Sequence, residues 1–181
     1  MAVAGPNGAG KTTFYHSHLE AVGLRFVNAD VFAGELDLDP YTAAKVADTV
    51  RRQLLNRGES FIFETVFSDP AGDKLRFLKE AVGRGYTVVL CYIGIATPKL
   101  SEERVAMRVS QGGHDVPGDK LKSRFPRSLA NLRRAIHELP HVLIYENSDL
   151  RRPFREVVVF EKGRCVRRSD KVPAWLAAIL K

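Results

Sequence analysis

The stretch Gly5-Pro6-Asn7-Gly8-Ala9-Gly10-Lys11-Thr12-Thr13 fits the pattern G-x-x-x-x-G-K-[ST] of a phosphate-binding loop, or P-loop. The glycines of such a loop let backbone N–H groups surround an anion, so we expect residues 5–13 to bind a nucleotide triphosphate. Lys11 would supply positive charge to the outer phosphates, and the Thr12 hydroxyl would bind a phosphate-bound magnesium ion. The motif requires a preceding strand and a following helix, and the apolar patterns of residues 1–4 and 11–22 predict both.

Apolar segments alternate with helical ones along the rest of the chain. Strands are predicted at 25–28, 60–63, 86–93 and 141–145, and helices at 41–57, 70–82 and, with an interruption, 101–137. This alternation indicates crossover units and a mostly parallel five-stranded sheet, with ligands at the carboxyl ends of the strands. We therefore predict a three-layer αβα fold of the P-loop NTPase class, with a helical lid over about 100–137. Residues 155–160 and 164–168 should form a C-terminal β-hairpin, and Pro173 should open a closing helix.

Composition limits the function classes. A chain of 181 residues with 45% hydrophobic content is long enough for one core, so residues 1–181 are expected to form a single P-loop kinase domain. No apolar segment is long enough to span a membrane, which predicts a cytoplasmic protein with no membrane partner. Cys91 and Cys165 lack metal-type spacing and are expected to be reduced.

The net charge of +7 is unevenly distributed. Residues 1–70 hold 6 Lys/Arg against 9 Asp/Glu, whereas the other 111 residues hold 22 against 12. In a P-loop kinase, carboxylates near the loop serve magnesium and proton transfer, and later arginines neutralise phosphorylated ligands. We therefore favour this explanation over nucleic-acid binding.

Two carboxylates follow apolar strands and should lie beside the P-loop. Asp30 could accept the proton of a substrate hydroxyl that attacks the γ-phosphorus, although an aspartate here could also cap a helix. Glu64, which precedes Thr65, could organise magnesium, bind a sugar or brace the base. Asp30, Glu64 and Thr65 are therefore candidate substrate contacts, and Thr12 and Glu64 candidate metal ligands.

Arginines of the cationic segment are candidates for contacts with phosphate. Arg104 and Arg108 lie four residues apart on one helix face and could close over phosphate, or could form local pairs with glutamates. Arg124 and Arg127 are further candidates for such contacts, and Arg124 is the one predicted to bind the acceptor. Gly112-Gly113-His114 is interpreted as a hinge of the lid.

The chain resembles the zeta-toxin-like P-loop kinases over most of its length. The motifs that carry the resemblance are residues 5–13, Val27-Asn28-Ala29-Asp30, Phe63-Glu64-Thr65, Arg104-Val105-Ala106-Met107-Arg108-Val109 with Gly112-Gly113-His114, and Arg127-Ser128-Leu129-Ala130-Asn131-Leu132. Zeta toxins phosphorylate the 3′-hydroxyl of UDP-N-acetylglucosamine using ATP or GTP and magnesium, and the resemblance implies this activity here. It also raises an antitoxin protein as a partner.

Within this resemblance, individual residues match the family's site. Asp30 falls on the family's base, Glu64 on the acidic residue after the third strand, and Arg104 on an arginine that reaches over the phosphates. Lys11 and Thr12 match the phosphate and magnesium contacts. The chain departs from the family near Gly112-Gly113-His114, where the second lid arginine of the toxins has no clear counterpart.

Two other functions stay open at this point. The basic later segments also suit a kinase for nucleic-acid ends, although aromatic residues for base stacking are scarce there. A nucleotide-gated binding module that hydrolyses ATP slowly and switches a partner would use the same loop.

Overall fold

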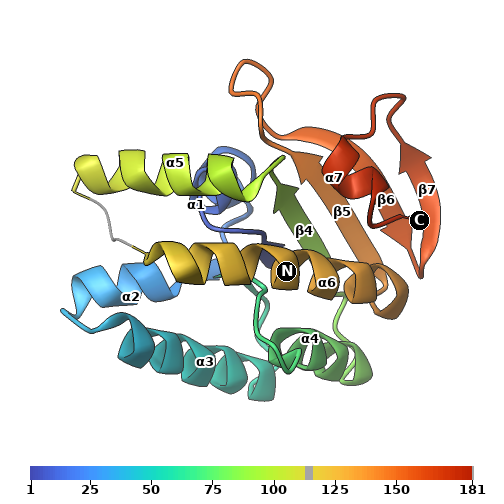
Figure 1. Cartoon of the computed structure of the whole chain (residues 1–181). Coiled ribbons are helices and arrows are strands. Elements are labelled where there is room, and N and C mark those ends of the chain that lie inside the picture. Colours follow the sequence, from blue (N-terminus) through green and yellow to red (C-terminus); the bar gives the residue numbers. More distant parts are fainter. Residues whose placement is uncertain (113–115, 181) are drawn as a thin grey trace.

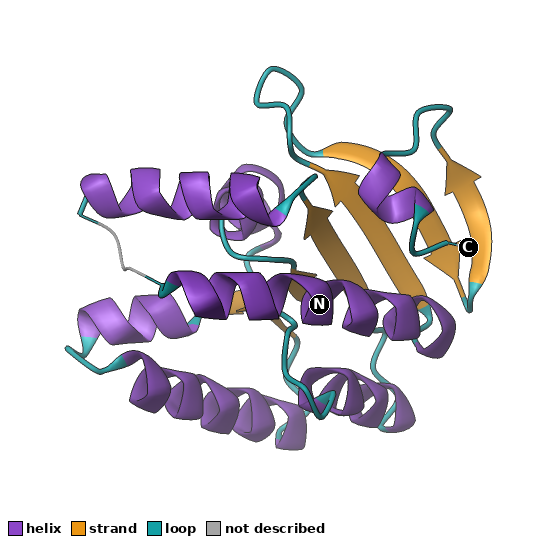
Figure 2. Ribbon diagram, viewed as in Figure 1, coloured by secondary structure: helices purple, strands orange, loops and turns teal. Residues whose placement is uncertain are grey.

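The computed structural model describes residues 1–112 and 116–180, and its centre is a seven-stranded sheet (Figures 1 and 2). The strands run in the order β2-β3-β1-β4-β5-β6-β7. The bounds are β1 Ala2–Ala4, β2 Arg25–Val27, β3 Phe61–Thr65, β4 Val89–Gly94, β5 His141–Glu146, β6 Arg155–Glu161 and β7 Arg164–Arg168. The first five strands in this order pair in parallel, and β6 and β7 add to β5 in antiparallel fashion. The predicted fold class is confirmed, and the predicted hairpin extends the same sheet.

Helices cover both faces of the sheet. Their bounds are α1 Lys11–Phe14, α2 Ala29–Glu35, α3 Pro40–Asn56, α4 Asp73–Gly83, α5 Pro98–Ser110, α6 Gly118–Glu138 and α7 Ala174–Ala177. A π-helical turn at Tyr15–Leu19 and a 3-10 turn at Glu20–Val22 continue α1. In Figure 1, α3, α4, α6 and α7 lie in front of the sheet and α1 behind it. None of the helices in the described ranges is long and apolar enough to cross a membrane.

Alternating side chains of the strands build two cores. Along β4, Leu90 and Tyr92 pack into the core on the side of α3, α4 and α6, whereas Cys91 and Ile93 pack toward α1. All four side chains are buried, as the continuous apolar run predicts for a central parallel strand. Burial raises the pKa of the Cys91 thiol to about 12, so this cysteine is an unreactive core residue.

Some boundaries differ from the sequence prediction. The strand β4 begins at Val89 rather than at 86, and α4 begins at Asp73 rather than at 70. The short helix α2 was not predicted separately because it spans only two turns. Its presence contradicts one of the two roles considered for Asp30: the helix cap is Asn28, whose Oδ1 accepts from the Asp30 backbone N–H at 2.9 Å, so the cap interpretation of Asp30 is wrong.

The predicted lid region contains α5 and the long helix α6. Pro126 lies inside α6 without ending it. Gly113 and His114 of the predicted hinge lie outside the described residues. At the far edge of the sheet, every residue of β7 is exposed, and three of its five residues are arginines.

Gly94, at the end of β4, lies against the indole of Trp175 from α7, and a Cβ atom there would overlap the ring. Trp175 cannot move freely because it is buried and donates a hydrogen bond to Glu146. We therefore expect Gly94→Ala to lower the free energy of unfolding by about 1–3 kcal/mol, as overpacking does. Urea denaturation would measure this loss.

Gly83→Ala is the matched control, because a Cβ atom at Gly83, in the last turn of α4, meets no atom within 4 Å. Alanine favours helix over glycine by up to about 1 kcal/mol, so this variant should be as stable as the parent or more so. Equal stability of the two variants would contradict the proposed packing of α7.

Candidate functional site

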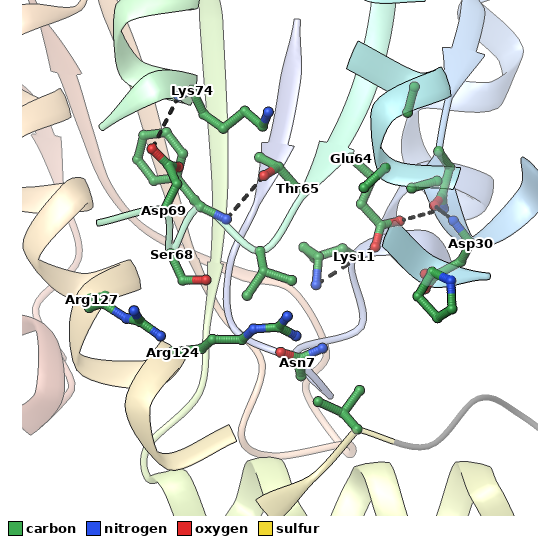
Figure 3. A pocket seen from close by; sticks show the side chains of 18 of the residues that line it. Asn7, Lys11, Asp30, Glu64, Thr65, Ser68, Asp69, Lys74, Arg124 and Arg127 are labelled. Atoms are coloured by element: carbon green, nitrogen blue, oxygen red, sulfur yellow. Dashed lines mark hydrogen bonds and ion pairs between the residues drawn. The ribbon is translucent and has the colours of Figure 1, made fainter. Parts of the chain in front are cut away.

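A cavity of about 520 Å³ opens beside the carboxyl ends of β1 and β3 (Figure 3). Its walls come from the P-loop, α2, α3, the segment from β3 to α4, α5 and α6. Many predicted site residues meet there; they are Asn7, Gly8, Lys11, Asp30, Glu64, Thr65, Arg108, Arg124 and Arg127. The topology explains the convergence, because β1 and β3 are parallel neighbours whose carboxyl ends share one edge of the sheet.

The P-loop is shaped by glycines in conformations that other residues rarely adopt. Gly8 and Gly10 have φ angles of +72° and +86°. Gly5, with φ of +145°, lies so close to β4 that a Cβ atom would overlap the carbonyl oxygen of Ile93. Glycine is therefore required at these positions by conformation and by space.

Protein side chains hold the carbonyl groups of the loop. Each of four successive carbonyl oxygens accepts a hydrogen bond from a side-chain donor. The pairs are Lys11 Nζ to Pro6 at 3.1 Å, Ser101 Oγ to Asn7 at 2.7 Å, Arg104 Nη1 to Gly8 at 3.3 Å, and Asn147 Nδ2 to Ala9 at 2.8 Å. Because donors of the protein occupy these oxygens, the loop keeps a conformation in which its N–H groups can serve an anion.

Glu64 connects β3 with the P-loop. Its Oε2 accepts hydrogen bonds from the Thr12 hydroxyl at 2.7 Å and from Asn28 Nδ2 at 3.1 Å, and its Oε1 lies 3.7 Å from Lys11 Nζ. The side chains of Lys11 and Glu64 are almost buried, which strengthens their interaction. The structure thus brings together the two residues predicted as metal ligands.

This pair fits magnesium. A hydroxyl and a carboxylate oxygen are ligands that the ion accepts, and Mg²⁺ usually keeps waters and phosphate oxygens as its other ligands. In the described ranges, no group of three or more His, Cys, Asp or Glu residues could form an all-protein metal site. Any ion at Thr12 and Glu64 would therefore depend on a phosphate ligand as well.

Asp30 lies in the first turn of α2 and lines the cavity. Its side chain is exposed, and within residues 1–112 and 116–180 its carboxylate has no hydrogen-bond or ion-pair partner. A carboxylate in this state can accept a proton from a ligand. In Figure 3, Asp30 lies on the same side of the cavity as Glu64.

The four predicted arginines fall into two groups. Arg108, Arg124 and Arg127 line the cavity. Arg104 does not: its guanidinium donates to the carbonyl oxygens of Gly8 and Ser148, at 3.3 and 3.0 Å. In this structure Arg104 therefore supports the P-loop from outside the cavity. Thr65 faces the cavity and accepts a hydrogen bond from the Phe67 backbone N–H at 3.1 Å.

Sequence reasoning missed several residues of the site. Asn147 directly follows β5, so its position at a strand end was a usable signal. Asn28 lies in the motif Val27-Asn28-Ala29-Asp30, but the motif does not indicate that its side chain joins Glu64 with α2. Ser101 had no sequence signal, because serine on a helix is common and only the fold brings it to the P-loop.

Asn147 offers a direct test of how the loop is held. It is buried, and its Oδ1 accepts from the Phe154 backbone N–H at 3.3 Å while its Nδ2 donates to Ala9. Asn147→Asp keeps the acceptor, removes the donor and places a carboxylate against the Ala9 carbonyl. We expect calorimetry to show nucleotide and tripolyphosphate affinities reduced roughly tenfold, because a lost buried hydrogen bond costs about 1–2 kcal/mol.

Ser148→Ala is the control for that variant, since it removes a hydrogen bond of the same segment, from the Ala96 backbone N–H, without touching the P-loop. Its affinity for tripolyphosphate should equal that of the parent. An unchanged affinity of Asn147→Asp would show that the Ala9 contact does not shape the anion site.

Solved structures with a similar fold include complexes of AvrRxo1-ORF1 with AvrRxo1-ORF2. A chain of the complex with sulphate ions is 18% identical, has a TM-score of 0.71, and is matched over 98% of this chain and 61% of its own length. A chain of the complex with ATP gives a TM-score of 0.67 at 18% identity, covering 91% of this chain and 58% of that one. This protein therefore spans about three fifths of the AvrRxo1 chains that it matches.

A third similar structure is that of the PezAT chromosomal toxin-antitoxin system of Streptococcus pneumoniae. It has a TM-score of 0.61 and 19% identity, and the match covers 99% of this chain and 76% of that one. No curated protein sequence matches significantly. Because the sequence identities are only 18–19%, the similarity to these three structures establishes the fold alone.

A match between the sequence and a family model identifies the family of the chain. The zeta toxin family model matches residues 40–161, about two thirds of the chain, from the start of α3 to the end of β6. The matched range does not include residues 5–13. The sequence motif and the geometry of the P-loop are therefore evidence that does not depend on the family model. The chain belongs to the zeta toxin family.

Proposed function

We propose that the protein transfers the γ-phosphate of ATP to a hydroxyl group of a small molecule, with Asp30 as the general base. One observation carries this proposal: an unpaired carboxylate and the P-loop line one cavity. A carboxylate that faced only solvent could not combine proton abstraction with phosphoryl transfer. GTP is the other donor compatible with this site.

The proposed reaction assigns a role to each group. The acceptor hydroxyl passes its proton to Asp30 as its oxygen forms a bond to the γ-phosphorus, and the bond to the bridging oxygen breaks to release ADP. Lys11 and the N–H groups of residues 5–13 hold the phosphates of the donor, and Arg108 stabilises the charge that develops on the transferred group. Arg104 acts by holding Gly8. Thr12 and Glu64 would hold Mg²⁺, which supplies neutralising charge on the phosphates.

We propose a nucleotide sugar as the acceptor, with UDP-N-acetylglucosamine as the leading candidate. Membership of the zeta toxin family supports this choice. The cavity has room beyond the P-loop, where Thr65, Arg124 and Arg127 line it. The similarity to a toxin-antitoxin structure supports an antitoxin as a protein partner.

Asp30→Asn tests the base. The amide cannot accept the hydroxyl proton, so we expect phosphoryl transfer from ATP to UDP-N-acetylglucosamine to fall by about 10²–10⁴-fold. Affinity for ATP should stay within about threefold, because Asp30 makes no contact with the P-loop. Product formation would be followed by ³¹P NMR, and nucleotide affinity by calorimetry.

Asp37→Asn is the matched control, an exposed aspartate between α2 and α3 that does not line the cavity and whose φ of +51° suits asparagine. It should transfer phosphate at the parent rate. Normal transfer by Asp30→Asn would exclude Asp30 as the base. ATP hydrolysis that is unaffected by every acceptor would instead favour a nucleotide-gated switch.

Glu64→Gln tests the proposed metal ligand. The amide keeps the size of the side chain but loses the negative charge, so the magnesium concentration for half-maximal transfer should rise at least fivefold. The maximal rate at saturating magnesium should change less than this concentration. A rate that falls equally at all magnesium concentrations would contradict metal binding by Glu64.

A further inference from the structure

The outermost strand of the sheet has one open edge. β7 is the last strand in the sheet order and pairs with β6 on one side. No other strand in the described part of the chain pairs with it, and Figure 1 shows it at the margin of the sheet. All of its residues are exposed. The backbone N–H and C=O groups on the outer side of β7 can therefore pair with a strand of another molecule.

A hollow of about 300 Å³ lies beside this strand. Its wall is apolar where Phe160 of β6, Ile136 of α6 and Leu180 near the end of the chain contribute to it. Cys165 and Arg168 of β7 also line it. Alternate side chains of a strand point to the same face of a sheet, so a strand added along β7 would direct every second side chain toward this hollow.

The charge around the hollow is positive. Arg133 of α6 and Arg168 of β7 line it, and no Asp or Glu is among the described residues that do so. Both arginines are exposed, and neither forms an ion pair within residues 1–112 and 116–180. By contrast, Arg134, the next residue of α6, pairs with Glu138 at 3.5 Å. Two arginines without carboxylates of their own suit a ligand that brings carboxylates, because each guanidinium can bind one at two points.

The same charge decides what kind of strand fits the edge. A second copy of this chain would bring its own arginine-rich β7, and like charges repel. Repulsion between copies explains arginines on β7, but it explains neither the arginine of α6 nor the apolar hollow between the two elements. An acidic segment with an apolar side chain matches the open edge, the hollow and the two arginines together.

We propose that the open edge of β7 and this hollow form a docking surface for an acidic, extended segment of a partner protein. The backbone of the segment pairs with β7, an apolar side chain enters the hollow, and carboxylates on the same face of the segment bind Arg133 and Arg168. Side chains on one face of a strand are two residues apart, so the segment has the pattern acidic-x-apolar-x-acidic. The surface shares no lining residue with the catalytic cavity and does not depend on the proposed reaction.

Titration of a short peptide tests the surface. The probe has capped ends and contains glutamate, threonine, leucine, threonine and glutamate in that order, and calorimetry with the whole protein measures its affinity. The parent should bind one peptide per chain. Lysine in place of both glutamates should abolish binding, and alanine in place of leucine should weaken it at least fivefold because the hollow stays empty. No saturable binding by the parent at millimolar peptide would overturn the proposal.

Arg133→Met and Arg168→Met test the two carboxylate contacts. Each variant should bind the peptide at least threefold more weakly, because one partner of a carboxylate is lost. Arg134→Met is the matched control: it makes the same change of charge on the same helix, but Arg134 does not line the hollow. This control should bind the peptide as the parent does, and unchanged AMP-PNP affinity would show that all three variants fold. Equal losses in Arg133→Met and Arg134→Met would show a response to overall charge and contradict the surface.

Methylation of the peptide backbone tests the pairing with β7. Alternate N–H groups of a strand point toward the same neighbour. One peptide is therefore N-methylated at both threonines, and another at the leucine and the last glutamate. Pairing along one edge predicts that one of these peptides binds at least fivefold more weakly than the other. Equal affinities would contradict strand addition.

Cys165 reports where the peptide binds. It is exposed and lines the hollow, whereas Cys91 is buried. Iodoacetamide should therefore modify Cys165 in the free protein, and saturating peptide should slow this modification at least threefold, as mass spectrometry would measure. Modification at the same rate with and without peptide would place the peptide elsewhere on the protein and overturn the proposal.

Discussion

The whole site depends on the hydrogen bonds that hold the carbonyl groups of residues 6–9 on protein donors. A glycine-rich loop is flexible by itself, and fixing its backbone costs conformational entropy. Here α5 supplies Ser101 and Arg104, and the end of β5 supplies Asn147, so two distant parts of the chain set the loop. The anion site therefore forms only when the sheet and α5 are in place.

The same constraint explains what the sequence could predict. The P-loop, the strand-end residues Asp30 and Glu64 and the alternation of strands and helices are local patterns, and the structure confirms the fold that they predict. Three of the four donors to the loop carbonyls lie 94 to 138 residues away from their acceptors. A local pattern can mark Asn147 as a strand-end residue, but it cannot show which carbonyl any of these three donors binds. Arg104 illustrates the limit: its spacing indicated a phosphate contact, whereas its guanidinium binds two backbone carbonyls.

The distribution of charge follows from the same topology. The acidic first part of the chain brings Asp30 and Glu64 to the cavity, and the basic later part brings Lys74, Arg108, Arg124 and Arg127. Arg51 is an exception, a cation from the acidic part that Asp48 holds at the cavity wall. A single net charge for the chain conceals this arrangement, because opposite charges separated in sequence meet in one place.

The hairpin of β6 and β7 has a further consequence for the sheet. Without it, β5 would present a row of unpaired backbone groups and could recruit strands of other molecules. The outermost strand β7 is instead short, exposed along its length and rich in arginine, and the opposite edge strand β2 has only three residues. Repulsion between arginines and the shortness of β2 thus discourage aggregation at both margins, and β1 and β3, which lead into the P-loop and carry Glu64, lie in the interior of the sheet away from them.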